Sequence, residues 1–140
     1  MILFPGVLSA QGGPVLAKAT HIKCTFSVMT VGTWGREQPE AKTKPASLTL
    51  EFEAINADEG TAELKASVGK YDIIVRYAQG YLHFIQSFYN GPLYVTTLLD
   101  KKTASGKLKA MHSRHEFTDF ALPGITSSPE QYIGECDILG

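Results

Sequence analysis

Short runs in which apolar and polar residues alternate follow one another through most of this sequence. In residues 48–54, apolar side chains take every second position, and threonine or glutamate stands between them. Successive side chains of a strand point to opposite faces of a sheet, so this pattern predicts a half-buried strand. About eight such runs, separated by glycine-containing turns, favour an antiparallel barrel or sandwich over an α/β fold.

Helix is expected to be scarce, because no stretch shows the 3.6-residue apolar period of an amphipathic helix. The fold class predicted is therefore all-β, an antiparallel meander of about eight strands that closes as a barrel or a closed sandwich. The polar stretch 35–45, which contains Pro39 and Pro45, is predicted to be the longest loop.

The two cysteines lie near opposite ends of the chain. Cys24 shares one face of an alternating run with Ile22 and Phe26, and Cys136 shares a face with Tyr132. Both sulfur atoms are therefore predicted to face an apolar interior, and they can form a disulfide if the first and last strands are neighbours. The alternative is two free buried thiols. Either role is structural, since no Cys-x-x-Cys motif lowers a thiol pKa.

Length and composition predict one folded domain over residues 18–140, after an apolar segment at 1–17. Hydrophobic residues make up 44% of the 140 residues, which excludes a disordered chain. The 13 Lys and Arg residues are balanced by 14 Asp and Glu and form no basic run, so no nucleic-acid partner is expected. No oligomeric state is predicted.

The apolar segment 1–17 bears on localisation. It is too short for a membrane-spanning helix, which needs about 20 apolar residues. Two places, Leu8-Ser9-Ala10 and Val15-Leu16-Ala17, resemble the end of a secretory signal, although no basic residue precedes them. We expect a secreted or periplasmic protein. The alternative is a cytoplasmic protein whose N-terminal arm packs on the domain.

The run that begins at Lys107 holds the polar residues of most interest. Leu108 and Ala110 share parity with His112, Arg114 and Glu116, so all five are predicted to face inward. Charged groups in an interior are costly unless they are paired. These three polar residues are therefore candidate ligand anchors. A β-bulge after the alanine would instead turn them to solvent.

Aromatic residues gather in three successive predicted strands. Tyr71, Tyr77, Phe84 and Phe88 are candidates to line a cavity for a flat or apolar ligand. Core packing is the alternative. Arg76 is the one cation in this span, and base stacking in a nucleic-acid groove needs more of them.

No metal site or cofactor is expected from the motifs. His112 and His115 have the spacing of a helical zinc motif, but positions three apart on a strand face opposite sides. The chain also has no phosphate-binding glycine loop and no nucleophile motif.

Two short motifs resemble those of lipocalins. Gly32-Thr33-Trp34 is similar to the Gly-x-Trp of that family, and Thr118-Asp119-Phe120 is similar to its Thr-Asp-Tyr. The tryptophan here follows a predicted strand instead of opening it, and phenylalanine replaces tyrosine. The resemblance implies a calycin-like, eight-stranded up-and-down barrel that binds small apolar ligands.

Three hypotheses for function follow. The first is a barrel that binds a small apolar or carboxylate-bearing molecule through the aromatic and polar residues named above. The second is an isomerase-type or cyclase-type enzyme that uses His112 as a base, with Glu116 to orient it. The third is an interaction module with a filled core. The sequence favours binding over catalysis.

Overall fold

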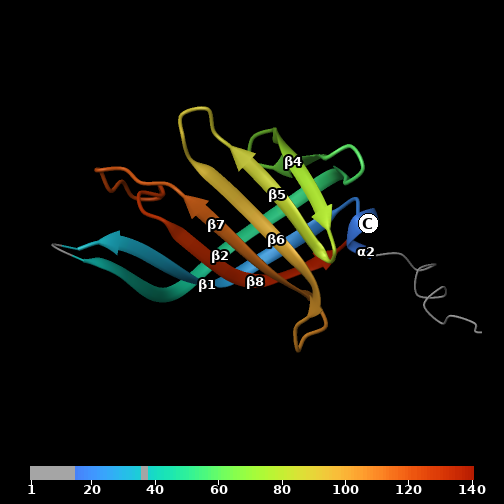
Figure 1. Cartoon of the computed structure of the whole chain (residues 1–140), viewed down its shortest axis with the longest axis horizontal. Helices are drawn as coiled ribbons and strands as arrows, with labels where there is room; N and C mark the ends of the chain where they lie inside the picture. Colours follow the sequence, from blue (N-terminus) through green and yellow to red (C-terminus); the bar gives the residue numbers. More distant parts are fainter. Residues whose placement is uncertain (1–14, 36–37) are drawn as a thin grey trace, which may run out of the picture.

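The structure is a computed structural model that describes residues 15–35 and 38–140. Its eight strands are β1 (Ile22–Trp34), β2 (Pro39–Asn56), β3 (Thr61–Lys65), β4 (Lys70–Ala78), β5 (Tyr81–Ser87), β6 (Leu93–Lys102), β7 (Leu108–His115) and β8 (Glu130–Ile138). Each strand pairs antiparallel with the next, and β8 pairs with β1 (Figure 1). The sheet therefore closes in a ring of hydrogen bonds, and the predicted all-β meander is confirmed.

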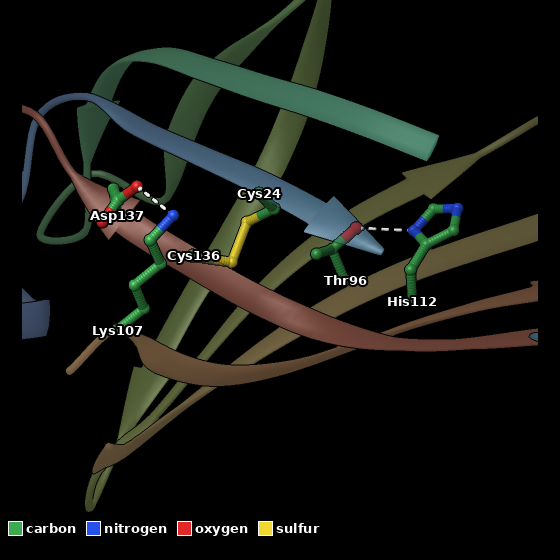
Figure 2. Close-up of a disulfide and its surroundings, with 6 residues drawn as sticks. All are labelled: Cys24, Thr96, Lys107, His112, Cys136 and Asp137. Carbon is green, nitrogen blue, oxygen red and sulfur yellow. Dashed lines mark hydrogen bonds and ion pairs between the residues drawn. A yellow bond between two sulfur atoms is a disulfide. The ribbon is translucent and has the colours of Figure 1, made fainter. Parts of the chain in front are cut away.

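The ring closes where the two cysteines meet. Cys24 of β1 and Cys136 of β8 lie directly opposite each other in the register, and a disulfide joins them (Figure 2). The predicted bridge is confirmed. Disulfides persist in oxidising compartments, so this bond is in keeping with a location outside the cytoplasm.

The core fills the middle of the ring. Phe52 of β2 and Phe84 of β5 stack with their ring centroids 3.9 Å apart, and Phe26 of β1 is equally buried. The alternating apolar positions of the sequence supply these inward side chains.

One short helix, α2 (Val15–Lys18), precedes β1 and buries Leu16 against the core. The rest of the apolar segment predicted at 1–17, residues 1–14, lies outside the described residues. Within the described part of the chain, no helix is long and apolar enough to cross a membrane.

The prediction of a long loop at 35–45 is wrong, because most of this segment belongs to a strand. β2 begins at Pro39, which pairs with Trp34, and the paired ends of β1 and β2 reach beyond the rest of the ring (Figure 1). Proline cannot donate a backbone hydrogen bond and is tolerated at strand starts and edges. Both Pro39 and Pro45 satisfy this condition, because β2 pairs with β3 only over residues 52–56 and leaves its other edge free before them.

Candidate functional site

The candidate site is built around His112, Arg114 and Glu116, which we call the polar row of β7. β7 pairs with β8 from Leu108 to Arg114 without a register shift, so no bulge follows Ala110. His112 is buried, with 3% of its surface exposed, and Arg114 is half-buried. Glu116, just past the end of the strand, is also half-buried.

His112 is held at both ring nitrogens. Its Nδ1 lies 2.7 Å from Thr96 Oγ1 (Figure 2), and its Nε2 accepts a hydrogen bond of 3.0 Å from Arg114 Nε. Because Nε2 is the acceptor, the ring proton is on Nδ1 and is donated to the threonine. Burial, with the nearby guanidinium charge, lowers the pKa of His112 to about 3. The imidazole is therefore neutral at physiological pH.

Arg114 lies between two tyrosine rings. Its guanidinium carbon is 4.8 Å from the ring centre of Tyr94 and 5.4 Å from that of Tyr132. Nη1 donates to Thr126 Oγ1 at 2.9 Å. Within the described residues, no carboxylate oxygen is within ion-pair distance of this guanidinium, and Nη2 has no hydrogen-bond partner. Arg114 therefore has free donors and, among the described residues, no carboxylate partner.

The same two tyrosines each hold a glutamate through the hydroxyl group. Glu116 accepts a hydrogen bond from the Tyr94 hydroxyl, and Glu130 accepts one of 2.7 Å from the Tyr132 hydroxyl. Burial, with the hydrogen bond to Glu130, raises the pKa of Tyr132 to about 12, and burial also raises the pKa of Tyr94. Both hydroxyls stay protonated and hold the carboxylates. We call the set Tyr94, His112, Arg114, Glu130 and Tyr132 the polar end of the ring.

The four aromatic residues predicted to line a cavity separate in the structure. Phe84 is buried in the core, and the Phe88 ring lies 4.9 Å from the ring of Tyr94 at the polar end. The Tyr77 hydroxyl instead accepts a hydrogen bond from the backbone N–H of Gly80. Tyr71 is 53% exposed. Of the four, Phe88 lies against Tyr94, and Phe84 lines the same hollow as His112.

The hollow that the described residues leave inside the ring beside His112 is small. A hollow of about 10 Å³, enough for about one water molecule, lies beside His112. It is lined by Leu50, Phe52, Leu64, Ile73, Phe84, Gln86, Tyr94, Thr96 and His112. A molecule larger than water therefore has to bind at the mouth of the ring or displace side chains.

Sequence reasoning missed the partners of the polar row. Tyr94 and Thr96 come from β6, where the register places them opposite Arg114 and His112. Tyr132 comes from β8, where it also lies opposite His112. The parity of Tyr132 with Cys136 was a signal that it faces inward. Nothing local in the sequence pairs it with His112.

The two histidines of the His112-x-x-His115 motif separate as their parity requires. His112 is buried, and His115 is exposed at the end of β7. Within the described residues, potential metal-ligating atoms converge at His21, Glu51 and Glu53, away from this site.

The two lipocalin-like motifs lie close together in space. Trp34, the last residue of β1, contacts Phe117 with ring centroids 5.4 Å apart, and Thr118 follows in the loop after β7. Comparisons with protein-family models, with curated proteins and with solved structures found no match to this chain. The lipocalin resemblance thus receives no support from them.

Proposed function

We propose that this protein binds a small carboxylate-bearing molecule at the polar end of the ring, with Arg114 as the anchor. The observation that carries the proposal is a half-buried guanidinium without a carboxylate partner in the described residues. Its planar fork of N–H groups matches the two oxygens of a carboxylate. Tyr94 and Tyr132 stabilise the cation through their ring faces and leave Nη2 free.

The small hollow limits how such a ligand binds. Only about one water fits beside His112, so the body of the ligand would lie at the mouth of the ring. The rings of Phe88 and Tyr94 supply apolar surface there. His112 would act as a neutral support that fixes the Nε of Arg114 and leaves the outer N–H groups for the ligand.

The binding function is tested with a panel of small aromatic and aliphatic carboxylates and their matched amides, by thermal shift and calorimetry. Acids should stabilise the protein more than amides, and Arg114→Gln should weaken acid binding at least tenfold, equivalent to about 1.4 kcal/mol. Arg76→Gln is the matched control, because Arg76 is exposed and belongs to β4, away from the polar end. Equal binding of acids and amides, or unchanged binding by Arg114→Gln, would refute the proposal.

The enzyme hypothesis has less support. Both nitrogens of His112 have partners other than Glu116, whose carboxylate accepts from Tyr94. A histidine with a pKa of about 3 is a weak general base near neutral pH. The geometry favours binding over acid–base catalysis.

An interaction module with a filled core is the second candidate function. It is favoured by the nearly filled interior and by exposed aromatic side chains at the tip of β1 and after β7. Trp34, Phe117 and Phe120 are 62%, 57% and 77% exposed. If this surface associates with itself, sedimentation velocity should show concentration-dependent dimers that Phe117→Ser abolishes. A monomer at all concentrations would remove that form of the hypothesis.

We also propose that the protein is exported, and the disulfide is the support for this. Cell fractionation with a thiol count under denaturing, non-reducing conditions tests it. Two free thiols in protein from its native source would contradict export.

A further inference from the structure

A second cluster of polar side chains lies on the outer face of the ring, away from the polar end. Glu51 and Glu53 flank the buried Phe52 on β2, so their side chains point outward. Ile22 pairs with Phe52, which sets His21 beside these two glutamates. Along β1 this position is at the start of the strand, near the C-terminus of the chain (Figure 1), whereas the polar end is near Val31.

The three side chains converge. His21 Nε2 lies 2.6 Å from Glu51 Oε2, and one ligand atom from each of His21, Glu51 and Glu53 lies within 4.8 Å of the others. The side chains are partly covered, with exposures of 33%, 21% and 26%. Three residues from two strands therefore present one nitrogen and two oxygens to a common point.

One oxygen of this cluster has no hydrogen bond. Glu53 Oε1 is buried, and its partner is Lys70, whose Nζ forms an ion pair with it at 3.4 Å. This carboxylate oxygen therefore already faces a cation, and the half-exposed ammonium of Lys70 is the group that a bound metal ion would displace from it.

We propose that His21, Glu51 and Glu53 form a binding site for a divalent transition-metal ion such as Zn²⁺. Zinc accepts histidine nitrogen at about 2.0–2.1 Å and carboxylate oxygen at about 2.0–2.2 Å, commonly with three protein ligands and one water. The partial exposure of the cluster leaves room for that water. Mg²⁺ and Ca²⁺ prefer all-oxygen sites, so the histidine selects against them.

Two lysines compete with the metal. Lys65 Nζ is 3.8 Å from Glu51 Oε1, and Lys70 Nζ is 3.4 Å from both Glu53 and Glu63. The lysine side chains are 54% and 50% exposed, so they can move into water when an ion binds. Removal of Lys70 should therefore strengthen metal binding, which would not occur for an ion held loosely by surface histidines.

The site is tested by calorimetric titration of Zn²⁺ into the metal-free full chain, with folding of each variant checked by circular dichroism. The wild type should bind one ion, His21→Ala and Glu51→Gln should each weaken binding at least tenfold, and Lys70→Met should tighten it several-fold. His115→Ala is the matched control, because His115 is an exposed histidine outside the cluster. Co²⁺ should give the intense visible absorption of tetrahedral coordination.

Binding that neither His21→Ala nor Glu51→Gln weakens would overturn the proposal, as would equal loss in His115→Ala. So would Mg²⁺ that competes with Zn²⁺ at equal concentration. The inference is independent of the proposed carboxylate binding, since Arg114→Gln should leave zinc affinity unchanged and His21→Ala should leave carboxylate affinity unchanged.

Discussion

Replacing Gly134 by alanine is expected to destabilise the ring, although glycine to alanine within a strand is ordinarily favourable. Alanine in the middle of a strand is more stable than glycine by about 0.5–1 kcal/mol. Gly134 lies in β8 between Phe26 of β1 and Ala110 of β7. Its φ is not positive, so backbone conformation does not require glycine there.

The space around Gly134 determines the sign of the effect. A Cβ at this position would overlap the backbone oxygen of Thr25 and lie 2.7 Å from Phe26 Cα and 2.8 Å from Phe26 Cδ1. Two of these three are backbone atoms, so β1 and β8 have to separate where the ring closes. Overpacking costs about 1–3 kcal/mol, and the backbone overlap places this change at about 3. Alanine regains about 0.5–1 kcal/mol through its better strand propensity, so the free energy of unfolding should fall by about 2 kcal/mol.

The assay is urea-induced unfolding of the oxidised protein, followed by far-UV circular dichroism. Gly32→Ala is the matched control, because a Cβ on Gly32 in β1 would meet its nearest atom, Pro129 Cβ, at 3.8 Å. That variant should be as stable as the wild type or more stable by up to about 1 kcal/mol. The steric reasoning is refuted if Gly134→Ala unfolds at the urea concentration of the wild type or of Gly32→Ala.

Three further predictions concern stability. Reduction of the Cys24–Cys136 bond, which spans a sequence separation of 112, is expected to lower the free energy of unfolding by up to about 5 kcal/mol, and a change below about 1 kcal/mol in urea unfolding would contradict this. The pKa of His112 is about 3 when folded against 6.5 when unfolded, so the unfolded state binds the proton first and stability falls as pH is lowered from about 6.5 towards 3. His112→Gln should lack this part of the pH dependence of unfolding, and an identical slope in both proteins would show that another group causes it. Phe84→Ala should cost about 3–5 kcal/mol, since the ring is buried and stacked. Tyr71→Ala, at a 53% exposed position, should cost about 1 kcal/mol or less in the same assay, and equal losses would contradict the assigned core.

The polar row shows which features of the site the alternation of residues along one strand can predict and which it cannot. Parity alone predicted that His112 shares a face with Ala110, and both are buried. Parity could not predict that Arg114 meets Tyr94 and Tyr132, because those contacts depend on pairing with strands distant in the sequence. The cluster of His21 with Glu51 has the same origin, since its members are 30 positions apart in the sequence.

The sequence pattern predicted the second half of β2 but not the part that begins at Pro39. Pro39 and Pro45 indicate a loop by local propensity, yet both lie in a strand. Residues 39–45 form a strand despite their local propensity, because β1 pairs with them throughout. The other edge of β2 is not paired with β3 there, so the prolines interrupt no hydrogen bonds on that side. An edge tolerates residues that a central strand does not.

The sequence by itself determined the all-β class, the meander and the inward face of both cysteines, because a period of two is a local property of the chain. Only the tertiary structure decided which side chains meet across the ring, how little space remains beside His112, and that Arg114 contacts tyrosine rings and has no carboxylate partner among the described residues. These features depend on register and packing between distant strands, and no local spacing in the chain specifies them.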